Sequence, residues 1–249
     1  MTQIVAVISH KGGTGKTSLV QNLAHELGRS RRVLAVDMDP QSNLTIGSGL
    51  ELLADRPTVL HAMHKPETTP EALVETPSYS LLPANLDLAL ADQQFAGHYD
   101  RNDKLRDALA RVADRYDVIL IDGPPNLGFF AFNALTAATQ VIVPLQCQPY
   151  AFRALDGTLQ LIDLVRKGNR ELRLQAVVLT MYDRRVTLTA SVEAAARQRF
   201  GPLVPQTVIP VNVSIAEATL DGVPVALYNP RSTGAAAYAA LAKELFNGN

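Results

Sequence analysis

Short apolar runs alternate along this chain with segments in which apolar residues recur every three or four positions. The runs predict strands at residues 3–9, 32–37, 79–83, 117–122, 140–145, 172–180 and 206–209. Several of them, such as Val-Ile-Leu-Ile at 118–121, are apolar without a break, as strands covered on both faces are. The pattern therefore predicts a sheet that is buried between two layers.

Segments with helical periodicity lie between the predicted strands, at residues 17–28, 102–116, 151–167, 188–200 and 233–246. Leu105, Leu109 and Val112 show the spacing of one helix face, with charged residues between them. Alternating strands and helices predict one α/β domain over residues 1–249, with a mostly parallel sheet covered by helices on both faces. Residues 44–77 carry four prolines and are expected to form loops and short helices. In such a fold, ligands bind at the carboxyl ends of the strands.

Composition narrows the possible functions only slightly. The chain has 249 residues, a net charge of −1 and one cysteine, Cys147, so a disulfide framework or a paired-cysteine metal site is excluded. No internal repeat or linker-like run divides it, and no apolar stretch is long enough to span a bilayer. The chain runs directly into its first predicted strand. We therefore expect no signal peptide. The single cysteine favours a cytoplasmic location.

The strongest chemical signal follows the first predicted strand. Here the chain reads Ser9-His10-Lys11-Gly12-Gly13-Thr14-Gly15-Lys16-Thr17-Ser18. A glycine-rich turn between a strand and a helix directs several backbone N–H groups at one point, which makes a phosphate site. Lys16 is expected to reach the β- and γ-phosphates, and the Thr17 hydroxyl to bind Mg²⁺. His10 replaces the first glycine of the usual P-loop pattern, and Lys11 adds a second lysine.

Carboxylates follow two other predicted strands. Asp37 and Asp39 stand two positions apart after the second strand and are expected to point into the same crevice. Asp122 ends the apolar run at 118–121, as the acidic residue of a Walker B strand does, and would bind the Mg²⁺ ion or its water. Thr17, Asp37 and Asp122 are thus the predicted metal-binding residues, and Asp37 is expected to support the ligands that contact the ion directly.

With these motifs in place, the sequence resembles the ParA/MinD group of P-loop ATPases over nearly its whole length. The variant K-G-G-x-G-K-[ST] at 11–17 is the deviant Walker A motif, VDMDPQSNLT at 36–45 resembles switch I, and LIDGPPNLGFFAFNAL at 120–135 resembles Walker B with switch II. The later segments LTMYDRR, TVIP-x-N and AEATLDG also resemble family landmarks. We identify the chain as a member of the ParA-type (Soj-like) partition ATPases.

The resemblance implies a mechanism and assigns roles to residues. It implies an ATPase that uses ATP and Mg²⁺, forms an ATP-sandwich homodimer, binds DNA without sequence preference and is released by a ParB-type partner, with nucleoid association in the ATP state. Lys11 would reach the partner's phosphates, and Asp39 would position the attacking water. Met181, Pro210 and Asn212 would pack the adenine. The predicted catalytic residues are Lys11, Lys16 and Asp39. The predicted nucleotide-binding residues are Lys11, Gly12, Gly13, Thr14, Gly15, Lys16, Thr17, Ser18, Met181, Pro210 and Asn212.

The predicted DNA contacts depart from the family pattern. Many members carry arginines around the IP-x-N-x loop, where this chain has Val211 and Ser214. The remaining candidates are Arg184, Arg185, Arg197 and Arg199, with residues 166, 167, 170 and 173 as possible neighbours. Several weak phosphate contacts, doubled in a dimer, would suffice for non-specific binding.

Other functions compatible with the same ATPase remain open. A ParA-like ATPase that positions a protein cargo would share every motif named above. A MinD-like membrane role needs a basic amphipathic C-terminal helix, whereas residues 239–249 carry one lysine and one glutamate. An amidoligase or kinase would need further substrate-binding groups near the γ-phosphate, and the sequence shows none beyond those assigned.

Overall fold

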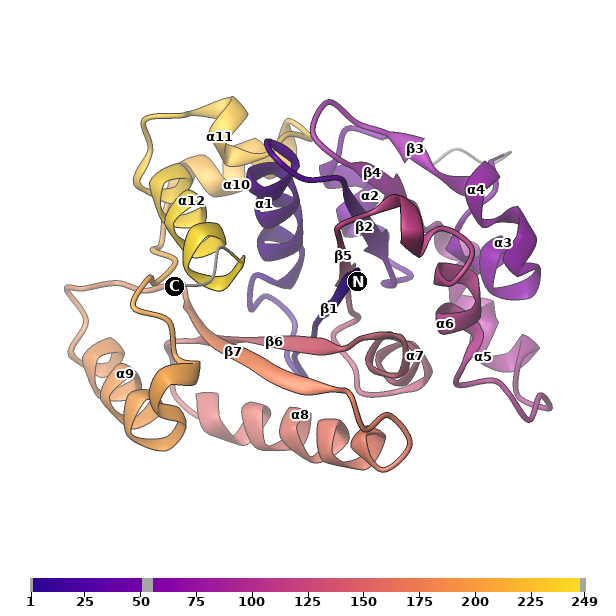
Figure 1. Cartoon of the computed structure of the whole chain (residues 1–249). Coiled ribbons are helices and arrows are strands. Elements are labelled where there is room, and N and C mark those ends of the chain that lie inside the picture. The colour runs from indigo at the N-terminus through magenta and orange to yellow at the C-terminus, as the bar shows by residue number, and fades with distance from the viewer. Residues whose placement is uncertain (1, 51–55, 247–249) are drawn as a thin grey trace.

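A seven-stranded sheet forms the centre of the computed structural model, which describes residues 2–50 and 56–246 (Figure 1). Its order is β3-β4-β2-β5-β1-β6-β7. The strands are β1 (Gln3–Val7), β2 (Val33–Asp37), β3 (Val74–Glu75), β4 (Ser80–Leu82), β5 (Val118–Asp122), β6 (Gln140–Gln146) and β7 (Arg173–Thr180). β3 pairs antiparallel with β4, and the other pairings in this sheet are parallel. The predicted mostly parallel sheet is confirmed.

Helices connect the strands and cover the sheet. The longer ones are α1 (Lys16–Gly28), α7 (Phe129–Ala137), α8 (Ala151–Arg166), α9 (Thr187–Phe200), α10 (Val213–Leu220) and α12 (Thr233–Phe246). The shorter ones are α2 (Asn43–Gly47), α3 (Val59–His64), α4 (Thr69–Ala72), α5 (Ala91–Gln94), α6 (Lys104–Leu109) and α11 (Val225–Tyr228). Single 3₁₀ turns lie at Pro66–Thr68, Leu86–Leu90, Ala113–Arg115 and Gly201–Leu203.

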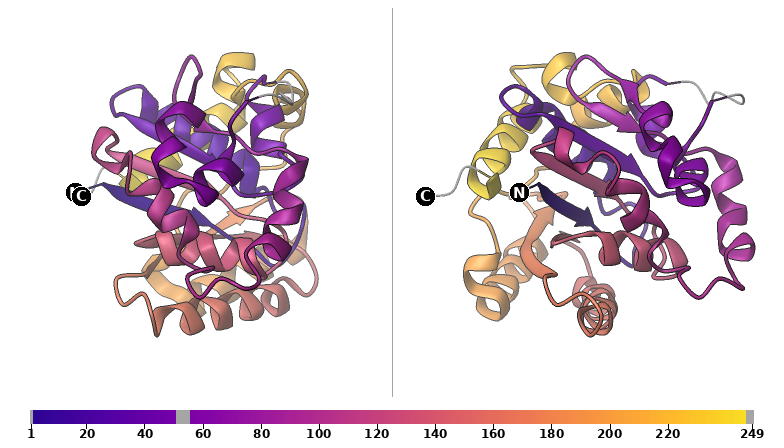
Figure 2. Two further views of the ribbon diagram at one scale, coloured as in Figure 1. Left: turned by 90° about the vertical axis from the view of Figure 1, so that its right-hand side faces the viewer. Right: turned by 45° about the vertical axis from the view of Figure 1, so that its right-hand side comes forward.

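The side chains of each central strand alternate between two hydrophobic cores. In β5, Ile119 and Ile121 pack in the core that also contains buried residues of α3, α6, α7 and α8. Val118 and Leu120 face the other core, which α1 and α12 cover. The two layers of helices are visible on opposite sides of the sheet in Figure 2. The strands have unbroken apolar runs because both faces of the sheet are buried. The predicted α/β class of fold is confirmed.

Parallel register brings the chemistry-bearing strand ends together. Val7, the last residue of β1, is paired with Asp122 of β5, and Asp122 is paired with Asp37 of β2. Neighbouring strands lie about 4.8 Å apart, so the loop after β1 and the two carboxylates lie side by side at one edge of the sheet. The Met38 N–H donates to the Asp122 carbonyl (3.0 Å) and continues this pairing beyond the strand end.

One predicted strand, at residues 206–209, is wrong. This segment is extended beside β7 but forms only an isolated bridge between Tyr182 and Pro210. Pro205 and Pro210 lack the N–H group that a ladder needs. The N–H groups of Gln206 and Thr207 are instead bound by the Glu244 carboxylate, at 2.6 and 3.0 Å.

The predicted helix at 102–116 is also shorter than expected. α6 ends at Leu109, and the chain then tightens into i→i−3 bonds before it enters β5. Leu105, Leu109 and Val112 nevertheless all lie in the core, so the predicted apolar face is confirmed.

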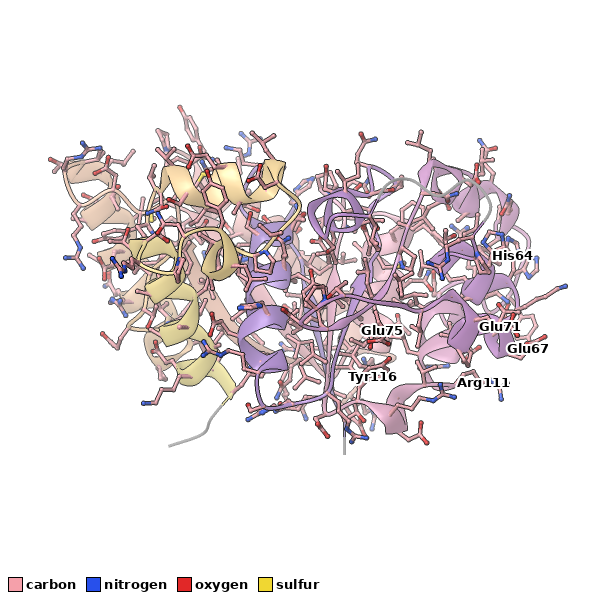
Figure 3. The ribbon with its side chains drawn as sticks, turned by 90° about the horizontal axis from the view of Figure 1, so that it is seen from above. His64, Glu67, Glu71, Glu75, Arg111 and Tyr116 are labelled. Carbon is pink, nitrogen blue, oxygen red and sulfur yellow. The ribbon has the colours of Figure 1, made fainter. Side chains whose placement is uncertain are left out.

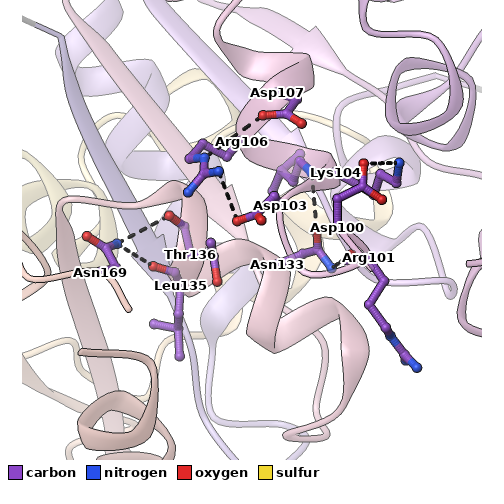
Figure 4. Close-up of polar contacts among 11 residues, drawn as sticks. Asp100, Arg101, Asp103, Lys104, Arg106, Asp107, Asn133, Leu135, Thr136 and Asn169 are labelled. Atoms are coloured by element: carbon purple, nitrogen blue, oxygen red, sulfur yellow. Dashed lines mark hydrogen bonds and ion pairs between the residues drawn. The ribbon is translucent and has the colours of Figure 1, made fainter. Parts of the chain in front are cut away.

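α7 was not predicted, because its sequence FFAFNALTA is apolar on every side and has no amphipathic period. Its buried Asn133 side chain ties it to the chain before α6 (Figure 4). The amide oxygen accepts the Leu105 N–H (3.1 Å), and the amide nitrogen donates to the Arg101 carbonyl (3.0 Å). At the other end, Asn169 donates to the carbonyls of Leu135 and Thr136. These bonds fix the helix that follows Asp122.

The segment between β2 and β5 forms its own end of the molecule. Its described part consists of short helices, 3₁₀ turns and the β3–β4 hairpin, as the prolines at 44–77 predicted, although the antiparallel β3 was not expected. Seen from above, Glu67, Glu71 and Arg111 lie at this end, away from α12 (Figure 3).

Candidate nucleotide site

The glycine-rich loop joins β1 to α1 at the carboxyl edge of the sheet. Gly13 and Gly15 have φ angles of 72° and 85°, a conformation that side chains with a Cβ rarely adopt. α1 then begins at Lys16, and no side chain caps its first turn. The N–H groups of this turn therefore have no intrahelical partner, which makes the helix start a site for an anion.

The Lys16 and Thr17 side chains point toward the strand ends. The Thr17 hydroxyl donates to Asp122 Oδ2 at 2.7 Å, and Lys16 Nζ donates to the Lys11 carbonyl at 3.2 Å. Lys16 is almost wholly buried, and Asp122 is completely buried. The second carboxylate oxygen of Asp122, Oδ1, is buried without a hydrogen-bond partner among the described residues. A buried carboxylate oxygen without a donor, next to a threonine hydroxyl, could bind a cation or a water molecule of its hydration shell.

Asp37 and Asp39 form a hydrogen-bonded turn beside Asp122. Asp37 is fully buried and accepts bonds from the N–H (2.9 Å) and hydroxyl (2.7 Å) of Thr45 and from the Asp39 N–H (3.1 Å). Asp39 is buried and accepts the Gln41 N–H at 3.0 Å. The Asp37 carboxylate therefore holds the turn together through Asp39 and Thr45. The Asp39 carboxylate accepts one bond, from the Gln41 N–H.

Burial controls the charges of this cluster. It raises the pKa of Asp122 well above its usual range, and the nearby Asp37 carboxylate raises it further, while the Thr17 bond and Lys16 oppose this shift. Burial also raises the pKa of Asp37 to about 6. Burial lowers the pKa of Lys16, although Asp122 and Asp39 favour its charged form. Because acids outnumber the base, a divalent cation at this edge would stabilise the ionised carboxylates.

A cavity of about 280 Å³ opens beside the start of α1. Gly15 and Ser18 line one side of it, and Met181, Pro210 and Asn212 line another. The structure thus brings the three residues of the predicted adenine site together, next to the glycine-rich loop. The amide nitrogen of Asn212 donates to the Thr233 hydroxyl at 2.8 Å, whereas its buried Oδ1 has no partner among the residues described. Apolar walls with an unused acceptor suit a flat ring that carries an N–H donor.

Lys11 lies at the mouth of the loop. Its side chain is exposed, while its carbonyl accepts the Lys16 ammonium (3.2 Å) and the Thr14 hydroxyl (3.3 Å). The other predicted loop residues stand where the motif puts them. Gly12 lies against Pro125, which follows β5, so the loop contacts the predicted switch II segment.

The four arginines predicted to bind DNA do not share one environment. Arg184 and Arg185 lie together in the loop after β7 and line an open groove of about 640 Å³, with Arg185 paired to Asp183 (2.7 Å). Arg197 is half-buried and holds Glu193 (2.8 Å) and two backbone carbonyls. Arg199 pairs with Asp156 on α8 (2.6 Å).

The expected adjacency of the arginines around residue 170 is wrong. Arg173 begins β7 and Arg184 follows its end, so these groups lie at opposite ends of an eight-residue strand. A strand of this length separates its ends by roughly 23 Å.

Two features of the site had no signal in the sequence reading. The Thr180 hydroxyl at the end of β7 donates to the Thr14 carbonyl in the loop (2.9 Å), although 166 positions separate the two residues. Met181 next to it has a φ angle of 50°, in the left-handed region that residues other than glycine rarely adopt. Both depend on how β7 packs against the loop, which no local pattern encodes.

Among the described residues, no group of three or more histidine, cysteine, aspartate or glutamate side chains could hold a metal ion by itself. No helix in that part of the chain is both long and apolar enough to cross a membrane.

A glycine-rich loop before an uncapped helix, with carboxylates on the two adjoining strand ends, defines a P-loop nucleotide-binding protein. A family model described as an AAA domain matches residues 2–174. Chromosome partitioning protein ParA of Myxococcus xanthus is 39% identical, over 98% of this chain and 87% of its own length. Sporulation initiation inhibitor protein Soj of Bacillus subtilis is also 39% identical, over 98% of each chain.

Among solved structures, cobyrinic acid a,c-diamide synthase from Mycobacterium smegmatis with bound ADP and magnesium superposes with a TM-score of 0.86. It is 35% identical, over 98% of this chain and 93% of that one. The chain belongs to the ParA/Soj-like family of P-loop ATPases. The family predicted from its motifs is confirmed.

Proposed function

We propose that this protein is a DNA partition ATPase that binds MgATP between the glycine-rich loop and the 280 Å³ cavity. The observation that carries the proposal is the convergence of four elements at one sheet edge: the loop after β1, Asp37 and Asp39 after β2, Asp122 at the end of β5, and the cavity beside Met181. The ADP and magnesium bound by the M. smegmatis protein support it.

Each part of MgATP has a matching group in the site. Backbone N–H groups from Gly12 to Thr17 and the Lys16 ammonium would hold the phosphates. Thr17 and Asp122 would hold Mg²⁺, with Asp37 behind them, because the Asp122 Oδ1 atom is buried and has no hydrogen-bond partner within residues 2–50 and 56–246. Asn212 Oδ1 would accept the exocyclic amine of adenine, where guanine presents an acceptor.

Hydrolysis would rely on positioning more than on a strong base. The bound Mg²⁺ would neutralise the charge on the phosphate oxygens. Asp39 would accept a hydrogen bond from the attacking water. The bond from the Gln41 N–H would hold the Asp39 carboxylate in place for this role. Lys16, whose charged form Asp122 and Asp39 favour against the effect of burial, would donate to the transferred phosphate. Turnover is therefore expected to be slow until a ParB-type partner stimulates it.

Lys11 would act on the nucleotide of a second copy. Its backbone is held by Lys16 and Thr14, while its side chain is exposed at the mouth of the loop. A cation delivered in trans stabilises the charge of phosphoryl transfer as an arginine finger does. ATP would thus join two protomers into a homodimer, and this dimer would bind DNA at the nucleoid.

Arg184 and Arg185 are the DNA contacts best supported by exposure and by the open groove that they line. Arg185 is paired to Asp183 but remains 88% exposed at the groove. Arg197 is bound to Glu193 and to two backbone carbonyls, and Arg199 is bound to Asp156 away from the groove, so these two would contribute less. A dimer doubles the number of phosphate contacts, so two arginines per protomer give four in all.

A ParA-like ATPase that positions a protein cargo is a second candidate. Val211 and Val213, beside the groove, are 61% and 70% exposed, and apolar side chains of this kind contact proteins better than phosphates.

The name of the M. smegmatis protein points to a third activity, an amide-forming reaction. The two partition relatives are at least as similar to this chain, so we favour partition.

Size measurement by light scattering, with ATP, ADP or no nucleotide, tests the proposed dimer. Wild type should be a dimer only with ATP. Lys11→Ala should bind ATP and stay a monomer, whereas Lys16→Ala should bind no nucleotide. A Lys11→Ala protein that dimerises and hydrolyses ATP normally would contradict the trans role of Lys11.

DNA retention by the ATP-bound protein at rising salt separates the two candidates. Partition predicts retention that falls steeply with salt, and a shallower slope for Arg184→Ala/Arg185→Ala. Arg199→Ala is the matched control and should change the slope little. Absence of retention at low salt would favour a protein cargo.

A further inference from the structure

The outer wall of the 280 Å³ cavity is a loop outside the helices and the sheet ladder. Residues 209–212 line the cavity on this side, and the segment forms no sheet ladder. Tyr182 makes two of its backbone bonds: the Tyr182 N–H donates to the Ile209 carbonyl (3.0 Å), and the Tyr182 carbonyl accepts the Val211 N–H (3.2 Å). The Ile209 N–H also donates to the Leu179 carbonyl of β7 (2.9 Å). The position of the wall around residues 210 and 211 therefore depends in part on what fixes Tyr182.

The Tyr182 side chain is anchored by α9. Its hydroxyl donates to Oε2 of Glu193, and the other carboxylate oxygen accepts Arg197 Nε at 2.8 Å. The hydrogen bond from Tyr182 is also the main cause that lowers the pKa of Glu193 below its usual range. Glu193 thus joins an aromatic residue from the loop after β7 to an arginine on its own helix.

Arg197 carries the connection to the beginning of the same wall segment. Its two terminal nitrogens donate to the carbonyls of Val204 and Pro205, each at 3.2 Å. The Glu193 carboxylate therefore stands between two anchors, one at residues 204–205 and one at 209–211. α9 lies beside the end of β7, where it can hold both (Figure 1).

The residue before Tyr182 shows why this point needs an anchor. Met181 lines the cavity and has a left-handed backbone, which persists only where the surroundings hold it. Gln146 donates to its sulfur at 3.1 Å, and Tyr182 follows it directly. If the Tyr182 hydroxyl lost its acceptor, both Met181 and the wall at 209–211 would be less well held.

We propose that Glu193 is a positioning residue for the nucleotide base: through Tyr182 and Arg197 it fixes the Met181 and 209–212 walls of the cavity. This inference rests on the proposed function, because it takes the cavity to be the site of the base. Glu193 does not contact the loop that would hold the phosphates, so its removal should affect binding of the base and leave phosphate binding unchanged.

Titration calorimetry with ADP, GDP and inorganic tripolyphosphate tests this separation. Glu193→Ala and Tyr182→Phe should each weaken ADP binding about tenfold, as the loss of a charge-assisted hydrogen bond does. The preference for ADP over GDP should narrow, and tripolyphosphate binding should not change. Steady-state assays should show a higher KM for ATP with kcat within about twofold of wild type, because uniform binding is lost.

Two further variants make the test specific. Asp156→Asn removes the Arg199 ion pair, which also joins α9 to a neighbouring helix but lies away from the wall, and should bind ADP like wild type. Glu193→Gln keeps an acceptor for the Tyr182 hydroxyl and should lie between wild type and Glu193→Ala.

Equal weakening of ADP and tripolyphosphate would overturn the proposal, since it would indicate a general loss of structure. Unchanged ADP binding in both Glu193→Ala and Tyr182→Phe would overturn it as well. If wild type itself bound no ADP, the proposed function would have failed, and this result is distinct from both.

Discussion

The proposed phosphate side and the proposed base side of the site are built in different ways. On the phosphate side, residues 11–17 are consecutive, and the carboxylates that face them end two strands in parallel register with β1. On the base side, the cavity is lined by residues from α1, the end of β7, the 209–212 loop, α10 and α12. One side is a local motif on a rigid sheet, and the other is an assembly of distant segments.

The two sides also differ in what holds them. The phosphate side has buried charged side chains. Strand pairing aligns them, and burying them costs desolvation free energy. The base side has apolar walls fixed by a few side-chain bonds, such as those of Glu193. We therefore expect substitutions on the phosphate side to abolish function and those on the base side to reduce it by degrees.

Lys16→Ala is the change with the largest expected effect. It removes the only lysine ammonium at the buried carboxylate cluster in the described part of the chain, so nucleotide binding should fall by about 10² or more. Calorimetry with ADP measures this loss. Lys104→Ala, which breaks an ion pair with Asp100 far from the loop, is the matched control and should bind normally. Binding by Lys16→Ala within threefold of wild type would contradict the assigned phosphate site.

Asp39→Ala should separate binding from hydrolysis on the same side. ATP binding and dimer formation should persist, while kcat falls by about 10²–10⁴, the range for loss of a general base or water-positioning group. Asp39→Asn keeps an acceptor for the Gln41 N–H and should lose activity equally, which would assign the effect to charge. Near-normal turnover in both variants would contradict a role for Asp39 in hydrolysis.

The buried carboxylate of Asp37 predicts a pH dependence of folding. Because burial raises its pKa to about 6, the folded protein holds this proton more tightly than the unfolded chain does. The resulting stability is complete below about pH 4 and is lost as the pH rises through 6. Relative to Asp37→Asn, wild type should lose about 3 kcal/mol of unfolding free energy across this window.

Urea unfolding between pH 4 and 7.5 measures this difference. Asp117→Asn is the control: Arg32 lowers the pKa of Asp117 to about 2, so the contribution of Asp117 to stability is lost only as the pH falls below 4, and the difference between wild type and Asp117→Asn should stay constant from pH 4 to 7.5. Parallel curves for wild type and Asp37→Asn would mean that Asp37 titrates normally.

Thr180→Val, with the smallest expected effect, tests the bond that joins the two sides. It removes the hydroxyl that donates to the Thr14 carbonyl, so the unfolding free energy should fall by about 1–2 kcal/mol. Thr180→Ser keeps the hydroxyl and should lose less. Urea unfolding distinguishes these values. Thr180→Val should also weaken binding of tripolyphosphate slightly, in contrast to Glu193→Ala.

The positions of the residues on the proposed phosphate side could be predicted from the sequence almost completely, because they are adjacent in the chain or end recognisable apolar strands. The same holds for the class of fold, since burial on both faces leaves a simple pattern of apolar runs. The secondary-structure prediction was wrong where contacts between distant segments decided the conformation of the chain. Residues 206–209 looked like a strand, but Glu244 on α12 takes the N–H groups that a strand would use.

The predicted arginine surface shows the same limit. Four arginines near one another in sequence looked equivalent, yet Arg197 is committed to Glu193 and to two carbonyls, and only Arg184 and Arg185 line the groove. Which charges remain available depends on partners from α8 and from residues 204–205, and no sequence spacing reveals them.

By itself, the sequence determined the sheet, its helical layers, the phosphate loop and the carboxylates opposite it. These features depend on the periodicity of apolar residues and on the residues at strand ends, and both can be recognised from residues that are consecutive in the chain. The tertiary structure alone decided the shape of the base cavity, the strained Met181, the Thr180 bond to the loop and the anchoring of Tyr182 by Glu193. Each of these joins segments far apart in the chain, so it exists only once the sheet and α9 have packed together.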